Sequence, residues 1–89
     1  MQRDRSGLLD YSMPARRDDT GRAFLELGIR CTTGTALPVD LVSAHMWFNL
    51  AAMRGNTDAI RLRREIAAEM TTQEITSAQR AAREWAITH

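Results

Sequence analysis

Residues 40–55, DLVSAHMWFNLAAMRG, carry the signals of one helix with a defined start and a defined end. Asp40 can accept hydrogen bonds from the free N–H groups of the first turn, and Gly55 can take the left-handed conformation that ends many helices. Apolar residues at helical spacing form two faces, the first with Leu41, Ala44, Phe48, Ala51 and Ala52, the second with Val42, Met46, Leu50 and Met53. A helix that is apolar on most sides must be covered on more than one side, so we expect neighbours against both faces.

A preceding helix is predicted from residues 18–20 to Thr32, followed by a loop to residue 39. Its inward stripe is expected to contain Ala23, Phe24, Leu27 and Cys31. Gly28 lies inside this helix, where glycine costs about 1 kcal/mol relative to alanine, and we therefore expect another helix to approach closely there. In the loop, Gly34 can take a positive φ and Pro38 disfavours helix at the residue before it.

Two further helices are predicted, to about residue 70 and to about residue 87. Asn56 or Thr57 caps the first of them, and Thr71 with Glu74 forms a capping box at the start of the second. Their inward stripes are Ala59, Leu62, Ile66 and Met70 in the first, and Ile75, Ala78, Ala82, Trp85 and Ala86 in the second. The loops are short, so the sequence predicts an all-α fold of two antiparallel helical hairpins.

Residues 1–20 are predicted to form an irregular N-terminal arm ahead of a helical domain over residues 21–89. The arm is rich in Arg, Asp, Ser and Gly, but it also carries Leu8, Leu9 and Tyr11. These side chains are either incidental apolar residues of a disordered tail or part of a segment that lies across an apolar surface. That surface could belong to this chain or to a partner protein.

Composition narrows the classes of protein. The chain has 89 residues and a formal charge of +1, which fits one small domain and gives no reason to expect specific nucleic-acid binding. Cys31 is the only cysteine, so no internal disulfide forms and no cysteine-based zinc site is indicated. No apolar run has the length of a signal peptide or a membrane span. We therefore expect a cytoplasmic protein with no transmembrane segment of its own, free or at the cytoplasmic face of a membrane complex.

The residues form no catalytic, cofactor-binding or metal-binding constellation, so we expect a protein that is not an enzyme and needs no cofactor. His45 has no Asp, Glu or Cys three or four residues away and is expected to be a polar residue between the two apolar faces. Cys31 is expected to act as a small hydrophobic residue. Trp47 and Trp85 fall at core spacing, which favours packing over stacking on bases or sugars.

One cluster of basic residues, Arg61, Arg63 and Arg64, is open to two interpretations. It could meet phosphate or an acidic patch of a partner. It could also be a solvated face balanced by nearby acidic residues, with the Arg63 stem packed and its guanidinium reaching water or a carboxylate. The mixed charge pattern favours the solvated face, because nucleic-acid binders usually show a stripe of one sign.

The chain resembles the Sel-one-like repeat, a relative of the tetratricopeptide (TPR) repeat. The resemblance rests on family spacing at Ala23, Leu27, Gly28, Gly34, Asp40, Ala44, Trp47, Ala51, Ala52, Gly55 and Ala59. The segment from Met70 to Trp85 is similar to the one that closes many bacterial members. Two positions depart from the family pattern, because Cys31 stands where an aromatic residue is usual and Ala36 where a second glycine is usual.

The resemblance implies a short TPR-like right-handed solenoid in which the two hairpins stack. Such repeats bury their faces by stacking on neighbours, and several are normally needed. This chain has one full repeat, with the second hairpin in the position of a cap. The other end of the stack has no cap in the sequence, so we expect the N-terminal arm or a second protein to cover it.

The resemblance and the apolar surface together predict a non-catalytic protein–protein interaction module, an adaptor or scaffold. The expected partner-binding residues are Leu8, Leu9, Tyr11, Glu26, Arg30, Val42, Met46 and Met53. The alternative is a small accessory subunit built permanently into a larger protein complex, which could be membrane-bound. Both hypotheses predict that the chain binds another protein or protein complex, and a homo-oligomer is also possible.

Overall fold

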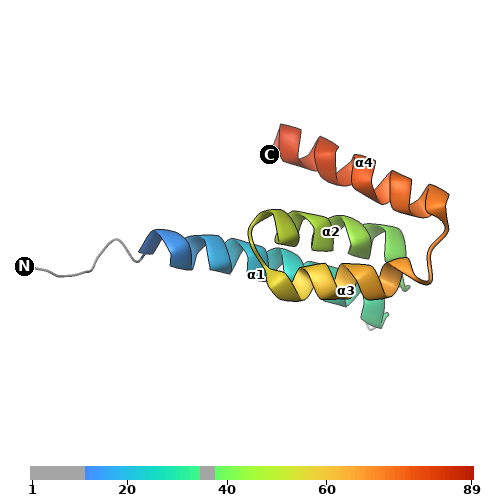
Figure 1. Ribbon diagram of the computed structural model, residues 1–89, viewed down its shortest axis with the longest axis horizontal. Helices are drawn as coiled ribbons and strands as arrows, with labels where there is room; N and C mark the ends of the chain where they lie inside the picture. The colour runs from blue at the N-terminus through green and yellow to red at the C-terminus, as the bar shows by residue number, and fades with distance from the viewer. Residues whose placement is uncertain (1–11, 35–37) are drawn as a thin grey trace, which may run out of the picture.

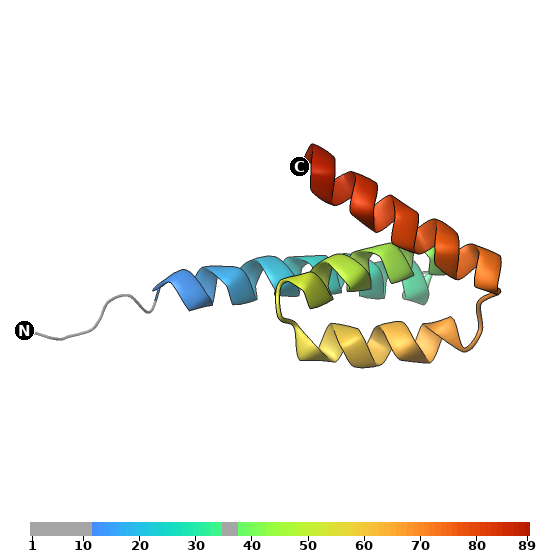
Figure 2. The same cartoon turned by 45° about the horizontal axis from the view of Figure 1, so that its top comes forward.

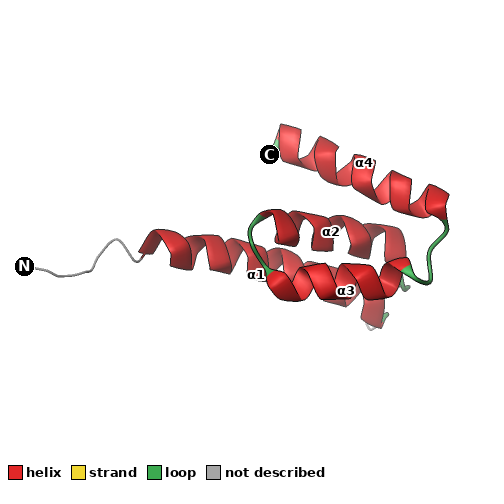
Figure 3. Cartoon of the chain, in the orientation of Figure 1, coloured by secondary structure: helices red, strands yellow, loops and turns green. Residues whose placement is uncertain are grey.

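The computed structural model describes the backbone of residues 12–34 and 38–89, and the side chains from residue 19 onward within those ranges. The described chain forms four α-helices and no strands, α1 (Ser12–Thr33), α2 (Leu41–Met53), α3 (Thr57–Ala67) and α4 (Thr72–Thr88) (Figure 3). The all-α prediction is therefore confirmed for this part of the chain.

Helix α2 lies at the centre of the arrangement. It packs against α1, α3 and α4, and these are the three close helix pairs of the described chain. Helix α1 runs alongside α2, while α3 and α4 lie on opposite sides of α2 (Figures 1 and 2). The expectation that other elements pack against both faces of this helix is borne out by these three neighbours.

The second helix pair differs from the prediction. Helices α3 and α4 were expected to close on each other as an antiparallel hairpin, but each of them packs on α2. Figure 2 shows α4 leading away from α3 toward the C-terminus. Because α2 offers apolar residues on more than one side, each of the two later helices can cover its apolar stripe against α2.

The capping signals in the sequence operate as predicted. The Asp40 carboxylate accepts the Ser43 N–H at 3.0 Å and the Ser43 hydroxyl at 2.7 Å, and Gly55 takes a φ of 88° after the end of α2. Asn56 caps α3, and Thr71 and Glu74 form the capping box of α4. Each side chain satisfies backbone N–H groups that a helix leaves without intrahelical partners.

Two helix boundaries differ from the prediction. Helix α1 begins at Ser12, so part of the stretch expected to be irregular is helical. Pro14 falls in the first turn of α1, where a missing N–H breaks no intrahelical bond. Helix α3 ends at Ala67 rather than near Met70, because the backbone tightens into bonds from Glu69 N–H to Ile66 O and from Met70 N–H to Ala67 O.

Gly28 on α1 permits a close approach to α2. A Cβ placed on Gly28 would lie 2.4 Å from Phe48 Cε1, and one on Gly21 would lie 3.4 Å from the Cβ atoms of Arg54 and Asn56. The close approach predicted at Gly28 is thus present, whereas a Cβ on Gly21 would make only ordinary contacts. Ala23 was predicted to face inward, but it is exposed, because the face toward α2 passes through Gly21, Phe24 and Gly28.

The core lies between α2 and its three neighbours. Its buried apolar residues are Phe24, Ala44, Phe48, Leu50, Ala51, Ala59 and Ala82. Phe48 is 1% exposed and is the largest fully buried side chain of the described chain. Small residues dominate the rest of the core, which brings the helix backbones close together. Ala86, expected to face inward at the end of α4, is exposed.

The Asp40 cap gives the first testable prediction. Replacing Asp40 with alanine removes the acceptor of two hydrogen bonds from Ser43 and should lower the free energy of unfolding by about 1 kcal/mol. Asp40→Asn keeps an acceptor oxygen and should lose less. Urea denaturation followed by circular dichroism measures both variants. An alanine variant as stable as the wild type would show that the cap contributes nothing.

Candidate interaction surface

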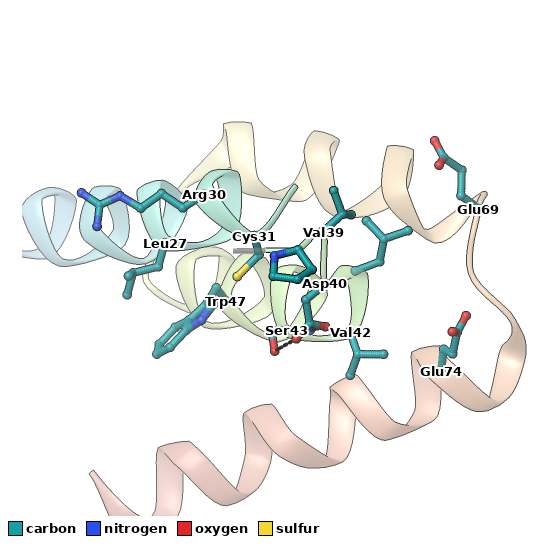
Figure 4. Close-up of a pocket in the computed structure, with 12 residues that line it drawn as sticks. Leu27, Arg30, Cys31, Val39, Asp40, Val42, Ser43, Trp47, Glu69 and Glu74 are labelled. Atoms are coloured by element: carbon teal, nitrogen blue, oxygen red, sulfur yellow. Dashed lines mark hydrogen bonds between the residues drawn. The ribbon is translucent and has the colours of Figure 1, made fainter. Parts of the chain in front are cut away.

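An open groove of about 1200 Å³ lies at the end of the molecule where α1 ends and α2 begins. Its apolar lining includes Leu27, Cys31, Pro38, Val39, Leu41, Val42 and Trp47, and its polar lining includes Arg30, Asp40, Ser43, Glu69 and Glu74. Figure 4 shows these side chains coming from α1, the start of α2, the α3–α4 connection and α4. The groove is therefore assembled from distant parts of the sequence.

A backbone hydrogen bond connects the two helix ends that line the groove. The Asp40 N–H donates to the Cys31 carbonyl at 2.9 Å, which fixes the end of α1 against the start of α2. Val39 is left 55% exposed at the mouth of the groove. Burial, followed by the nearby Asp40 charge, raises the pKa of the Cys31 thiol. The thiol therefore stays protonated and apolar in character, which suits the small hydrophobic role expected of it.

Val42, Met46 and Met53 form a second apolar feature, which we term the α2 strip. At about 100° per residue, their positions fall within about 40° of one another on the helix. Asn49, which bonds to α3, flanks the strip on one side, and buried Leu50 flanks it on the other. Val42 and Met46 are half-buried, while Met53 is 66% exposed. The strip therefore opens toward solvent at the C-terminal end of α2.

Three aromatic rings join α4 to the first two helices. Phe24 stacks on Trp47 with ring centroids 5.7 Å apart, and Trp85 meets both rings edge-on at 5.2 and 5.7 Å. His89 stacks on the other side of Trp85. The rings fill the space between the helices, so both tryptophans serve packing as the sequence predicted.

A polar network crosses from α2 to α3. His45 is 3% exposed, and its Nδ1 lies 3.5 Å from the Asn49 Nδ2. The Asn49 Oδ1 accepts a hydrogen bond from the Arg63 guanidinium. One nitrogen of the Arg63 guanidinium thus bonds to an amide, a partner that the sequence did not predict. Burial lowers the pKa of His45, and the Arg63 charge lowers it further.

This network predicts a stability that depends on pH. As the pH falls below about 6.5, His45 in the unfolded chain takes up a proton that the buried residue resists. The unfolded state then binds more protons, so the free energy of unfolding should fall with pH, by at most about 1.4 kcal/mol per pH unit. Urea denaturation between about pH 5 and 7 measures the slope, and His45→Gln should reduce it. His89→Gln, at an exposed histidine, is the control. Equal slopes in the wild type and His45→Gln would contradict the prediction.

The predicted partner-binding residues are distributed unevenly over this surface. Arg30 and Val42 line the groove, and Met46 and Met53 continue from Val42 along the α2 strip. Glu26 is exposed on α1 and is not part of the groove lining. Leu8, Leu9 and Tyr11 lie outside the described residues. The structure thus brings Arg30 and Val42 to one groove and leaves Met53 at the other end of α2, and the role of these residues in binding stays a prediction.

Several lining residues were not predicted as contacts, among them Val39, Glu69 and Glu74. The sequence places Val39 at the end of a loop, Glu69 on a charged face and Glu74 in a capping box. Pro38 and Val39 directly before the Asp40 cap were the available signal, because apolar residues ahead of an N-cap often pack against neighbouring elements. The glutamates join the groove only through the path of the α3–α4 connection.

The described helices include none that is long and apolar enough to cross a membrane. Among the described residues, no group of three or more His, Cys, Asp or Glu side chains is placed to hold a metal ion. No protein-family model matches the chain, and no match is found among curated proteins or solved structures. The resemblance to Sel-one-like repeats therefore stays a prediction from the residues.

Proposed function

We propose that this chain is a non-catalytic protein–protein interaction module that docks through the groove and the α2 strip. The supporting observation is that α2, although packed by three helices, leaves Met53 exposed and Val42 and Met46 only half-buried along one face. Apolar positions repeated along one helix face are the usual anchors when one helix or extended segment docks on another. Arg30 and Glu69 at the groove supply the polar contacts that give such a site specificity.

The fold supports the same proposal at the level of architecture. We infer that α1 and α2 form a Sel-one-like repeat, because Gly28, Ala44, Ala51 and Ala59 occupy tight helix contacts and Gly34 and Gly55 have positive φ. In a solenoid of this type the curved face binds other proteins. Function transferred from a fold is an analogy, so the binding surface itself has to be tested.

The proposal is tested by using the tagged full chain to capture proteins from an extract of the producing cells. The amount of each captured protein is compared between the wild type and variants of the surface. We expect one protein to be recovered on the tagged full chain and to fall at least tenfold with Val42→Thr/Met53→Gln. Both substitutions remove apolar character from the α2 strip with little change in volume. Ile87→Gln is the matched control, because Ile87 is 84% exposed at the far end of α4.

Quantitative mass spectrometry of the captured proteins provides the readout. Equal recovery with the wild type, the double variant and the control would contradict docking through the α2 strip. Circular dichroism of each variant establishes that a loss of recovery reflects the surface and not unfolding.

A permanent accessory subunit is the second candidate, favoured by the spread of exposed apolar residues. Val39, Met53 and Ile87 lie on three different elements, an arrangement that suits a chain enclosed by a larger assembly. Such a subunit should co-purify at a fixed ratio and lose stability when separated. An adaptor should bind reversibly as a stable, separately folded chain. Gel filtration of the captured complex at increasing dilution separates the two.

A further inference from the structure

We propose that the groove receives the N-terminal segment, residues 1–11, of a second copy of this chain. The inference rests on the proposed function and specifies the partner of that surface. In this arrangement two copies exchange their segments, and each groove is lined by one copy and filled by the other. The apolar anchors are Leu8, Leu9 and Tyr11.

The length of α1 separates the segment from the groove of its own chain. Gly21 meets the C-terminal end of α2 at Arg54 and Asn56, so the residues of α1 before Gly21 extend beyond α2 (Figures 1 and 2). From Ser12 to Cys31, which lines the groove, the helix axis spans about 28 Å. Leu9 lies three residues before Ser12, and a fully extended chain of that length spans only about 10 Å. The anchors therefore cannot fill their own groove while α1 is helical.

The chemistry of the groove fits the segment. Leu27, Val39 and Trp47 provide apolar lining for two leucines and a tyrosine. Arg3 and Arg5 precede the leucines in the sequence, and Glu69 and Glu74 lie at the opposite side of the lining from Arg30 (Figure 4). With Leu8 and Leu9 in the apolar part, Arg3 and Arg5, which flank Asp4, can reach Glu69, while the Glu74 carboxylate already accepts the Thr71 N–H. Such pairs fix orientation more than they add affinity.

Cysteine cross-linking tests the exchange directly, because Cys31 lines the groove and is the only cysteine of the chain. In the full-length Leu9→Cys variant, mild oxidation should join the new thiol to Cys31 of another copy. A non-reducing gel should show a covalent dimer, and peptide mass spectrometry should identify the mixed pair. Two controls report pairing between identical positions. The wild type has only Cys31, and Leu9→Cys/Cys31→Ser has only the new cysteine.

Sedimentation equilibrium supplies a measurement that needs no cross-link. The wild type should dimerise, and Leu8→Ser/Leu9→Ser on the segment or Val39→Asp at the groove mouth should each raise the dissociation constant at least tenfold. Val39 is exposed, so its substitution leaves the fold in place. Ile87→Ser should dimerise like the wild type.

Three results would overturn the proposal. They are an internal disulfide within one chain, cross-links only between identical positions, and a wild type that is monomeric up to about 0.5 mM. A monomer that still captures a different protein through Val42 and Met53 would overturn the exchange and leave the proposed function standing. If the dimer forms and depends on the N-terminal segment, but no other protein is captured through Val42 and Met53, the exchange stands and the proposed function is overturned.

Discussion

Replacing Gly28 with valine is expected to lower the free energy of unfolding by about 3 kcal/mol or more. A Cβ at this position would lie 2.4 Å from Phe48 Cε1 and 2.6 Å from Cδ1. The ring cannot swing away cheaply, because Phe48 is almost completely buried between the helices. The two helices would have to separate, and that would loosen the contacts of α2 with the rest of the core. A domain of this size has a total stability of only about 4–13 kcal/mol, so much of the population should unfold.

Urea denaturation followed by circular dichroism measures this loss. Ala23→Val is the matched control, because it places the same side chain on the exposed face of the same helix. It should cost less than about 1 kcal/mol, the difference in helix propensity. Combining Gly28→Val with Phe48→Leu should recover part of the loss, since the two side chains compete for one space. Equal stability of Gly28→Val and Ala23→Val would show that α1 does not pack on α2 at this point.

Replacing Trp85 with alanine is expected to release α4 and to cost about 2–4 kcal/mol. The Trp85 ring meets Phe24 at an interplanar angle of 87° and Trp47 at 72°, so one side chain joins α4 to both α1 and α2. Aromatic pairs contribute about 0.5–1.5 kcal/mol each beyond the area that they bury. The two buried residues of α4 are the small Ala78 and Ala82, beside the half-buried Ile75. They offer little to hold the helix once the ring is gone.

Amide hydrogen exchange reports this release residue by residue. The amides of α4 should lose protection in Trp85→Ala, while those of α1 and α2 keep more of theirs. Fluorescence gives a second readout, because Trp47 becomes the only tryptophan and its emission should move to longer wavelength as its cover is removed. Trp85→Phe should retain most of the stability, and Ile87→Ala should change little. Full protection of α4 in Trp85→Ala would contradict the prediction.

The helices and their ends could be predicted because their signals are local. Asp40, Asn56 and Thr71 each bond to a backbone N–H three residues away, so a short window of sequence contains the whole interaction. The start of α1 at Ser12 was missed, because a polar stretch with a proline in its first turn carries no apolar periodicity. The close contact at Gly28 was predicted from the cost of glycine in a helix.

The pairing of the later helices and the groove could not be predicted from the sequence. In the sequence, the apolar stripes of α3 and α4 are compatible with each other and with α2, and only the three-dimensional arrangement decides between these pairings. The groove combines Leu27 with Val42 and Glu74, and no local pattern marks that combination. Because α2 is apolar on most of its sides, Met53 was predicted to be uncovered, and it is exposed. The same reasoning did not detect that Leu50 would be buried while Val42 and Met46 stay half-buried.

The central position of α2 has a consequence for how the chain is made. During synthesis α2 leaves the ribosome second, but its last neighbour, α4, is complete only after residue 88 has been added. Until then Trp47 lacks the cover that Trp85 of α4 provides, and the nascent chain presents an apolar helix to its surroundings. Chaperones that hold apolar segments should therefore meet this protein between the emergence of α2 and that of α4. A nascent chain stalled with α3 outside the exit tunnel and α4 still inside should retain such a chaperone, and one extended by a linker that brings α4 outside should release it.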